Sequence, residues 1–433
     1  MNFNIFKSGF VQGVIKLHAR YLSNLGATFI SQAVSALSIL ILTPYLIKEL
    51  GTEQFSIYGV ILNLIIFSSI FDFGLNIGLL RKLVHKYKHY EQLINILFMF
   101  FIVLFFCSIP FFTLLFKSGL IKAGNHYFLT SIFVTIIVTQ NILSTLLDVI
   151  IQSVNKIFIG KFIRIIRTII EFTLLFFVCK MGSVIYLLMS TALINFLYLI
   201  TLFIYSKKEV KFSLNLNYFK FSILWEHIVY SFWYFQNTIA SVLVYNAQII
   251  LISNFLDSVN VAKYLLVTRF YDIIRTGLTN FTMVLFPSIS SLQAEGNWTR
   301  LRKVYLNVLL RVSIMVFVIF SLILSIGKII FVKWSHFEDT TTIHLFQLYS
   351  VFIALLIIEH VPTVFLSALK FNKYPSIISM VQGILGLLLS YLFLPNYGIL
   401  GAVFASLVAF LLTNFWYNPY YINKMINRKI IVQ

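Results

Sequence analysis

Long apolar segments alternate with short polar or glycine-containing stretches along the chain. A membrane-spanning helix needs about 20 mostly apolar residues, and the chain contains twelve segments of this kind. They lie at about 24–47, 54–80, 93–116, 128–153, 159–179, 184–205, 228–254, 263–287, 304–326, 343–367, 375–394 and 398–421. The segments 159–179 and 263–287 are the least apolar, because each carries several charges. The pattern predicts an all-α polytopic membrane protein with about twelve transmembrane helices.

Composition narrows the class of protein further. Apolar residues make up 60% of the 433 positions and charged residues 11%, against roughly 25% charged residues in a soluble domain. Such a chain cannot cover a water-exposed surface with polar groups, which excludes a soluble enzyme, a nucleic-acid-binding domain and a disordered chain. In a soluble protein a net charge of +19 would point to nucleic acid. In a membrane protein the collection of Lys and Arg on one side accounts for it, so we expect no nucleic-acid partner.

The positive charges are distributed unevenly between the two sides of the membrane. When the polar stretches are assigned to alternate sides, 21 Lys and Arg residues fall on the side that holds both termini and 7 on the other, while five arginines lie within the segments. Lys and Arg collect on the cytoplasmic side of membrane proteins. The bias therefore predicts a multi-pass protein with both termini in the cytoplasm.

The order of the segments predicts four regions. They are a cytoplasmic interfacial amphipathic helix at 1–20, an N-terminal six-helix bundle at 21–205, a basic cytoplasmic linker at 206–227, and a C-terminal six-helix bundle with a short basic tail at 228–433. The first region qualifies because Phe3, Phe6 and Phe10 recur at helical spacing between basic and polar residues, as in helices that lie on a membrane surface.

A weak internal repeat supports the division into two halves. LGTEQFSIY at 50–58 follows the first segment, and LDSVNVAKY at 256–264 follows the seventh, at an offset of 206 residues. Paired repeats with a shared central site are typical of transporters. We therefore expect two six-helix bundles around a central cavity.

Ionisable side chains within membrane segments are costly, so each is a candidate for function. The segment 159–179 carries Arg164, Arg167 and Glu171 on one part of its helical wheel. The segment 263–287 carries Arg269, Asp272 and Arg275 at spacings of three, which places them on one face. Such faces either form buried ion pairs that fix helix packing or line a water-filled cavity that contacts substrate.

Three further carboxylates lie within the segments. Asp72 belongs to a polar stripe with Ser68 and Asn76, and Asp148 to one with Asn141, Ser144 and Gln152. Each stripe suits interhelical hydrogen bonds or ion coupling. Glu359 stands beside His360 and is either a protonation site or part of a neutral buried pair.

Uncharged polar side chains form another candidate surface. Gln236, Asn237 and Gln248 follow one side of the segment 228–254. Such a surface suits sugar hydroxyls, and it equally suits plain helix packing.

The sequence contains no glycine-rich phosphate loop, no HExxH or CxxC motif and no convincing nucleophile set. Its two cysteines, Cys107 and Cys179, both lie in apolar runs. We therefore expect no cofactor, no metal site and no enzymatic activity. Any energy input must then come from an ion gradient, with H⁺ or Na⁺ as candidates, or from the gradient of the substrate.

One stretch is more specific than composition. It is ILTPYLIKELGTEQFSIYGVILNLIIFSSIFDFGLNIGLLRKL at 41–83, and RFYDIIRTGLTNFTMVLFPSISSL at 269–292 and YGILGAVFASL at 397–407 accompany it. These stretches resemble Wzx-type O-antigen flippases, which form part of the polysaccharide transporter branch of the multidrug/oligosaccharidyl-lipid/polysaccharide exporter superfamily. The resemblance covers most of the chain, although its motifs are diffuse.

The resemblance implies a function and a substrate. Such a protein moves an undecaprenyl-pyrophosphate-linked oligosaccharide, an O-antigen repeat unit, across a bacterial inner membrane by alternating access, and it works beside an O-antigen polymerase and a chain-length regulator. The family's two bundles surround a V-shaped cavity, in which Arg167 and Arg275 would meet the anionic substrate. Arg164, Arg269, Gln236, Asn237 and Gln248 are the other substrate-binding candidates, and Asp272, Glu171, Glu359, Asp72 and Asp148 are the candidates for ion or proton coupling.

Two other functions remain open. A cation-coupled multidrug antiporter of the same superfamily would want a carboxylate-rich cavity, whereas arginines and carboxylates within the segments balance at five each. A membrane polysaccharide polymerase or glycosyltransferase usually needs long extracytoplasmic loops, and none here exceeds about 16 residues.

Overall fold

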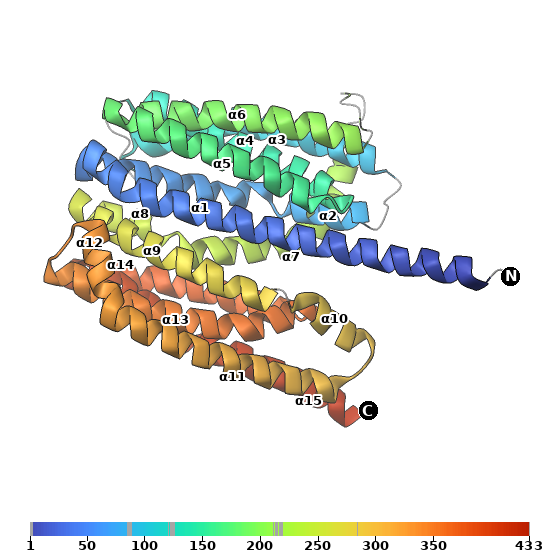
Figure 1. The fold of residues 1–433 in the computed structure, drawn as a ribbon. Helices are drawn as coiled ribbons and strands as arrows, with labels where there is room; N and C mark the ends of the chain where they lie inside the picture. Colours follow the sequence, from blue (N-terminus) through green and yellow to red (C-terminus); the bar gives the residue numbers. More distant parts are fainter. Residues whose placement is uncertain are drawn as a thin grey trace. The chain divides into compact units, whose positions relative to one another are not determined.

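The computed structural model describes residues 3–84, 89–119, 121, 126–210, 212, 215, 220–283 and 285–432, without the side chains of 3–22, 25, 68, 287 and 432. All regular elements of this described part are helices (Figure 1). The main helices are α1 (Phe3–Phe67), α2 (Leu75–Val84), α3 (Tyr90–Lys117), α4 (Tyr127–Ser153), α5 (Ile157–Val178), α6 (Val184–Glu209), α7 (Phe221–Tyr245), α8 (Gln248–Phe255), α9 (Ser258–Met283), α10 (Phe286–Ala294), α11 (Trp298–Leu322), α12 (Lys328–Ser335), α13 (Thr340–Ala368), α14 (Lys373–Leu412) and α15 (Asn414–Val432).

Eight helical segments of the described chain are long and apolar enough to cross a membrane. Gly26–Asp72 covers most of the spans predicted at 24–47 and 54–80, and Lys373–Ile431 contains those predicted at 375–394 and 398–421. Within them the chain turns at Gly51 and Gly398, whose φ angles of 74° and 56° are those that glycine adopts without strain. The eight segments thus hold ten of the twelve predicted spans.

The remaining two predicted spans are α5 and α9, helices of 22 and 26 residues. Their charged side chains lower their mean hydropathy, as the sequence already indicated for 159–179 and 263–287. The predicted all-α, polytopic fold is therefore confirmed.

Contacts divide the chain into two compact units. Unit 1 comprises 1–42, 75–112 and 129–230, and unit 2 comprises 43–74, 113–128 and 231–433. Residues 43–74 thus pack with the later part of the chain, a grouping that the sequence did not suggest. The division of the chain at 206–227 into two six-helix bundles stays a prediction.

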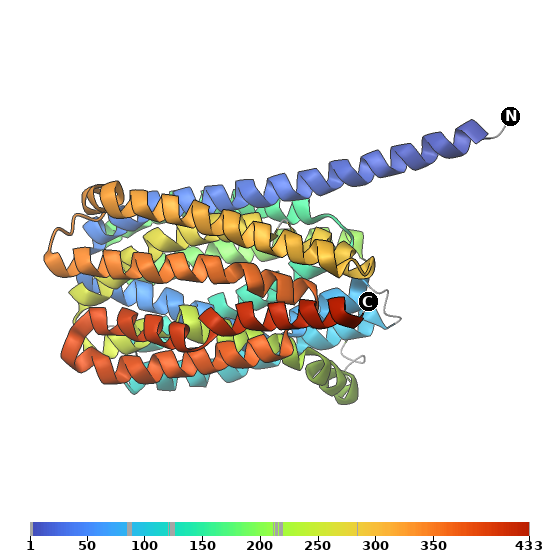
Figure 2. The same cartoon turned by 90° about the horizontal axis from the view of Figure 1, so that it is seen from below.

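Packing within unit 2 centres on α13. The helices α9, α11, α14 and α15 all pack against it, and Figure 2 shows the later helices as one parallel group. Lipid offers no hydrogen-bond partners, so polar groups within membrane helices must find them in the protein. A central helix such as α13 that contacts several others provides such partners.

The linker of unit 1 is docked on α3 at the positions that the structure describes. Phe212 is buried, and its ring stacks on that of Phe98 with 6.2 Å between centroids. The side chain of Asn95 accepts a hydrogen bond from the Asn215 backbone N–H at 2.8 Å. The aromatic contact and the side-chain hydrogen bond together hold this basic stretch against the helices.

The predicted helix at 54–80 is interrupted, which corrects the sequence analysis. A 3₁₀ turn, Ser68–Asp72, is followed by Phe73 and Gly74 with φ angles of 50° and 69°. A Cβ on Gly74 would lie 2.6 Å from the Phe235 backbone nitrogen. Close approach of α7 to the chain at Gly74 therefore accompanies the break, and only glycine leaves room for it.

The amphipathic helix predicted at 1–20 is part of α1, which runs on without interruption into the first span. The side chains of 3–22 lie outside the description, so its position on a membrane surface stays a prediction.

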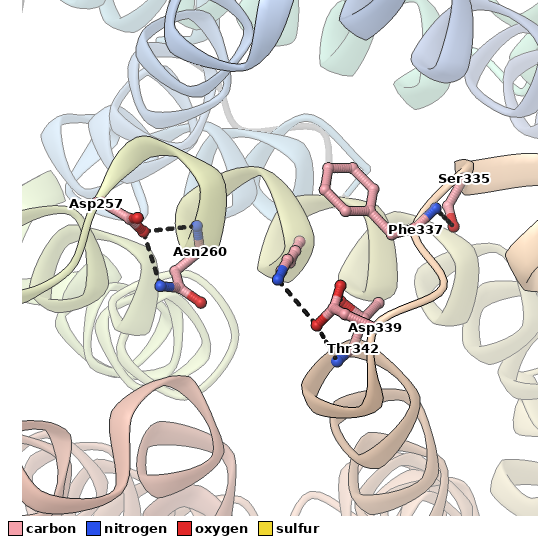
Figure 3. A network of polar contacts seen from close by, with 7 residues as sticks. Asp257, Asn260, Ser335, Phe337, Asp339 and Thr342 are labelled. Atoms are coloured by element: carbon pink, nitrogen blue, oxygen red, sulfur yellow. Dashed lines mark hydrogen bonds and ion pairs between the residues drawn. The ribbon is translucent and has the colours of Figure 1, made fainter.

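A polar network joins two helix starts in unit 2 (Figure 3). Asp257 accepts hydrogen bonds from the backbone N–H and the side-chain amide of Asn260, at 3.0 and 2.7 Å, at the start of α9. Asp339 caps α13 by accepting from the Thr342 N–H and hydroxyl at 3.1 and 2.8 Å. Lys263 of α9 lies 2.9 Å from Asp339 Oδ2 and ties the two starts together.

The network predicts a pH dependence of stability. Burial works against the charged form of Asp339, but hydrogen bonds from Lys263 and Thr342 outweigh it and hold the pKa of Asp339 below its ordinary value. A carboxylate with a lowered folded-state pKa stabilises the fold above its unfolded pKa, about 3.9 for aspartate, and loses this contribution as pH falls through the folded value.

We therefore expect Asp339→Asn, which keeps a capping oxygen, to flatten the loss of thermal stability of detergent-solubilised protein below about pH 4. Asp339→Ala should in addition cost about 1 kcal/mol at neutral pH through the lost cap. Asp257→Asn is the matched control, because Asp257 caps a helix and forms no ion pair with a lysine in the described part of the chain. An unchanged acid profile in Asp339→Asn would show that the Lys263 pair contributes nothing.

Candidate functional site

The first cluster lies in unit 2, where α9 faces α7. Arg275 forms an ion pair with Asp272, with Nη2 at 3.0 Å and Nε at 3.3 Å from the same Oδ1 atom. The Arg275 guanidinium carbon also lies 4.4 Å from the centre of the Tyr245 ring. The arginine is thus held by a carboxylate one turn away and by an aromatic face of a neighbouring helix, which is a favourable place for a cation.

Arg269 behaves differently from its neighbours on α9. The sequence placed it on one face with Asp272 and Arg275, and it is half-buried. No ion pair of Arg269 is found within the described chain, since Asp272 is taken by Arg275. The predicted face is therefore present, but only two of its three charges are paired.

The second cluster lies in unit 1 and repeats the first in chemistry. Arg167 Nη2 lies 3.1 Å from Glu171 Oε2, one turn further along α5. The guanidinium carbon lies 5.4 Å from the ring centre of Tyr198 on α6. The Nε atom of Arg167 is buried, and the described residues offer it no acceptor, so this arginine retains an unused donor.

A third ion pair joins α4 and α5. Arg164 Nη2 lies 3.1 Å from Asp148 Oδ2, and Gln152 donates to the same oxygen at 3.2 Å. The sequence analysis assigned Arg164 and Asp148 to separate polar faces and did not pair them. The short connection between α4 and α5 provides the missing signal, because it brings the end of one helix beside the start of the next.

Glycine makes room for this third pair. Gly160 of α5 is buried, and a Cβ there would lie 2.5 Å from Asp148 Oδ1. The close approach of the carboxylate to the α5 backbone depends on the absence of a side chain at this position.

The two tyrosines were missed by the sequence analysis. Tyr245 and Tyr198 each lie against the arginine of an arginine–carboxylate pair. The chain has 23 tyrosines, and no spacing rule connects a residue of one helix with a particular face of another. Each cluster therefore consists of an arginine, a carboxylate on the same helix and a tyrosine from a second helix.

Glu359 of α13 has only neutral partners. Its Oε1 atom accepts hydrogen bonds from the Thr363 hydroxyl and from the side-chain amide of Asn418 on α15, both at 2.6 Å. Glu359 is buried, and no cationic partner is found in the described part of the chain. These hydrogen bonds join Glu359 to Thr363 and Asn418 rather than to His360, since residues adjacent along a helix point in different directions.

The polar surface predicted on 228–254 is divided. The helix is interrupted between Tyr245 and Gln248, so that Gln248 starts α8 and leaves the register of Gln236 and Asn237. Gln248 is buried and donates to the Ser406 hydroxyl at 2.9 Å, beside Gly383 and Gly386, in a small pocket. It therefore contributes to helix packing. Gln236 is half-buried and Asn237 exposed.

Asp72 ends the 3₁₀ turn rather than continuing a helix. The break at Phe73 and Gly74 separates it from Asn76, whose amide donates to the Ile142 carbonyl at 3.3 Å. The predicted stripe of Ser68, Asp72 and Asn76 is therefore not a helical face, and the side chain of Ser68 lies outside the description. Within the described residues, no group of three or more His, Cys, Asp or Glu side chains could hold a metal ion.

The fold defines a multi-pass membrane protein, and its helices carry paired charges. A family comparison is specific: residues 21–293 match the family described as "Polysaccharide biosynthesis protein". The chain therefore belongs to this polysaccharide biosynthesis family, which confirms the resemblance drawn from 41–83. A search among curated proteins finds no match.

Several solved structures share the fold. A multidrug resistance MATE family transporter of the MOP superfamily, inward-facing, gives a TM-score of 0.74 at 12% identity, covering 92% of this chain and 96% of that one. The lipid II flippase MurJ, inward closed, gives 0.70 at 15%, covering 94% and 90%. The Vibrio cholerae MATE transporter VcmN, in its bent form, gives 0.66 at 14%, covering 96% and 98%. At these identities the likeness shows the fold alone.

The close approach of the Asp148 carboxylate to Gly160 predicts that a larger residue at position 160 destabilises the protein. Gly160→Ala should destabilise the protein by about 1–3 kcal/mol, because its methyl group must displace the Asp148 carboxylate from Arg164. In an Asp148→Ala background the same change should cost little, since coupled sites are not additive. Thermal unfolding in detergent measures both.

Gly277→Ala is the matched control. Gly277 also lies within a helix, but its Cβ would meet nothing within 4 Å, so alanine there should be neutral or stabilising. Equal costs at the two glycines would contradict the packing that we describe.

Proposed function

We propose that the protein moves an undecaprenyl-pyrophosphate-linked oligosaccharide, an O-antigen repeat unit, from the cytoplasmic to the outer leaflet of a bacterial inner membrane. Membership of the polysaccharide biosynthesis family supports the substrate class. The shared fold with multidrug transporters and a lipid II flippase supports a transport mechanism. The observation that carries the proposal is the pair of arginine–carboxylate–tyrosine clusters within membrane helices.

The clusters suit an anionic head group. A guanidinium presents five donors and binds phosphate oxygens in a bidentate manner. Arg275 directs two of these donors to a single Asp272 oxygen, and Arg167 retains a buried Nε without an acceptor in the described chain. The carboxylates then hold the arginines in place until a pyrophosphate competes for them, and the tyrosines offer faces on which a sugar can stack.

The role of each remaining candidate follows its surroundings. Arg269 is the in-span arginine of α9 without an ion pair in the described chain, and it suits a first contact with phosphate. Arg164 is paired with buried Asp148, which favours a role in packing α4 on α5. Gln236 and Asn237 are accessible to a sugar hydroxyl, whereas Gln248 is taken up by Ser406.

A cation-coupled multidrug antiporter is the second candidate function. Glu359 favours it, because a buried carboxylate with neutral partners attracts a cation. Two observations favour the flippase: Asp148, Glu171 and Asp272 are each paired with an arginine, and the family match concerns polysaccharides. A polymerase and a chain-length regulator are the partners that the proposed substrate implies.

Arg275 provides the direct test of substrate binding. We expect Arg275→Ala to reduce flipping of a labelled undecaprenyl-pyrophosphate-linked saccharide in proteoliposomes by tenfold or more, since a charge-assisted hydrogen bond contributes about 1.5–3 kcal/mol. The flipping rate of Arg275→Lys should lie between those of the wild-type protein and Arg275→Ala, because an ammonium keeps the charge but cannot bind phosphate in a bidentate manner. Arg311→Ala is the control, since Arg311 is exposed on α11. Normal flipping by a well-folded Arg275→Ala protein would leave Arg275 a structural residue.

We further propose that transport is coupled to an ion, and that a carboxylate beside an arginine carries the coupling. Protonation of Asp272 or Glu171 would free the neighbouring arginine for the anionic substrate, and deprotonation would restore the ion pair and favour release. A ligand shifts an equilibrium only through its different affinity for the two states. Glu359, Asp72 and Asp148 are further coupling candidates, and the hydrogen bonds of Glu359 within the described chain come from neutral partners.

An imposed proton gradient should accelerate flipping by the wild-type protein, and Asp272→Asn should abolish the acceleration while basal exchange remains. Thr279→Val, one turn beyond Arg275, removes a hydroxyl that bonds only to its own helix and is the matched control. A gradient of Na⁺ in place of protons identifies the ion. Equal rates with and without either gradient would leave facilitated diffusion driven by consumption of the product.

A further inference from the structure

Aromatic and basic side chains from three helices of unit 2 meet where α14 begins. Lys373 is the first residue of α14, and its Nζ atom lies 5.6 Å from the ring centre of Trp233 on α7 and 5.8 Å from that of Tyr374. The Tyr374 ring meets the Tyr421 ring of α15 edge to face at 5.8 Å, and Tyr421 stacks on Tyr417 at 5.7 Å. We call these five residues the aromatic–lysine patch.

Much of the patch is accessible from outside the protein. Trp233 and Tyr374 expose 46% and 50% of their surface, and Lys373 is exposed as well. Exposed aromatic rings alone are common where a membrane protein crosses the membrane–water interface. The lysine adds a cation that lies over two ring faces, and its ammonium group carries three N–H donors. The patch therefore combines ring faces and a positive charge in one place.

The patch is separate from the Arg275 cluster. Trp233 precedes Tyr245, which contacts Arg275, by twelve residues of α7, and such a stretch of helix is about 18 Å long. The rings of Tyr374 and Tyr421 touch, so this part of α15 lies at the same end of unit 2 as the start of α14. The distribution of Lys and Arg predicts that this end faces the cytoplasm.

No carboxylate side chain accompanies these cations in the last part of the sequence. Residues 360–433 contain no Asp or Glu, and their basic residues are Lys370, Lys373, Lys424, Arg428 and Lys429. Lys373 takes part in none of the ion pairs found among the described residues. A surface that carries charges of one sign attracts partners of the opposite sign. We therefore expect an anionic partner at the patch.

We propose that the aromatic–lysine patch is a loading site for the substrate, at which Lys373 binds the pyrophosphate and the rings of Trp233 and Tyr374 stack on the first sugar. The inference rests on the proposed transport function, and it adds a binding step before the substrate reaches the arginine clusters. The order of groups fits, because the pyrophosphate of the substrate is bonded directly to the first sugar while the polyprenyl chain remains in the membrane.

The rings favour a lipid that carries a saccharide over a phospholipid. Lysine binds phosphate as a point charge, so it accepts the phosphate of either lipid. The exposed faces of Trp233 and Tyr374 offer an apolar surface to the C–H face of a sugar ring, which a phosphatidylglycerol head group lacks. Both ring centres lie within 6 Å of the Lys373 nitrogen, so a phosphate and the sugar bonded to it can be held together.

The first test measures how strongly the substrate is captured. In proteoliposomes of phosphatidylcholine, Lys373→Ala should raise about tenfold the membrane fraction of labelled undecaprenyl-pyrophosphate-linked saccharide that gives half-maximal flipping, as the loss of one charge-assisted hydrogen bond implies. The maximal rate should stay near that of the wild-type protein. Lys373→Arg should retain most of the affinity, because it keeps the charge and the donors. An unchanged half-maximal fraction in folded Lys373→Ala protein would overturn the inference while the proposed function stands.

The second test separates the two parts of the head group. Tyr374→Leu should raise the half-maximal fraction of the saccharide-linked lipid, while inhibition by undecaprenyl pyrophosphate without sugars stays unchanged. Lys373→Ala should weaken the binding of both lipids. Tyr374 is exposed, so the leucine variant should fold, and thermal unfolding in detergent checks this. Equal weakening of both lipids by Tyr374→Leu would contradict the assignment of the rings to the sugar.

Lys429→Ala is the matched control. Lys429 is exposed on α15, about two turns beyond Tyr421, and its replacement removes the same charge. The half-maximal fraction should then stay at the wild-type value. An equal effect at Lys429 and Lys373 would show a general attraction of anionic lipid and overturn the loading site. An effect at Lys373 that appears only in vesicles containing phosphatidylglycerol would overturn it as well.

Photocross-linking distinguishes a failure of the inference from a failure of the proposed function. Ile377 is exposed on α14, one turn beyond Lys373 and on the same face. The variant Ile377→p-benzoylphenylalanine should cross-link to the labelled lipid, and Lys373→Ala should reduce the yield. If the protein flips no substrate but still gives a cross-link that depends on Lys373, the proposed function fails and the loading site is retained. Absence of the cross-link in a folded protein with Lys373 intact would overturn the loading site.

Discussion

The cost of an unpaired charge in lipid governs the interior of this protein. Arg167, Arg275 and Arg164 each lie about 3 Å from a carboxylate, because water is absent from the hydrocarbon layer and the protein itself must supply the partner. An ion pair formed at this cost is poorly justified by stability alone, since apolar residues of similar size often serve as well. The proposed function accounts for this cost where a pair gives up its arginine to the substrate.

The three ion pairs differ in how readily they could exchange. Asp148 is buried and receives a second hydrogen bond from Gln152, so its release would leave several groups unsatisfied. Asp272 is considerably more exposed, with 45% of its side chain accessible against 8% for Asp148, and its ion pair within the described residues is with Arg275. Separation of the Asp272–Arg275 pair disturbs the hydrogen bonds of fewer side chains among the described residues. The Asp272–Arg275 pair of α9 is therefore better suited to release its arginine to a substrate, and the Asp148–Arg164 pair is better suited to hold α4 against α5.

Local spacing predicted part of this arrangement. The twelve apolar segments and the pairs within α5 and α9 follow from periodicity, because residues three or four apart on a helix always meet. The Asp148–Arg164 pair, the two tyrosines and the partners of Glu359 depend on which helix faces which, and composition does not encode that. The sequence analysis also missed the helix breaks at Gly74 and beyond Tyr245, because both lie within the mostly apolar segments predicted at 54–80 and 228–254.

The repeat shows how much a weak signal gains from a structure. Two identities in nine residues prove little, yet the same offset pairs Gly59 with Leu265 and Thr52 with Ser258 across one contact. At this contact Leu265 fills the space that the missing side chain of Gly59 leaves. A larger side chain at residue 59 would therefore need a smaller one at residue 265, because the contact leaves no room for both.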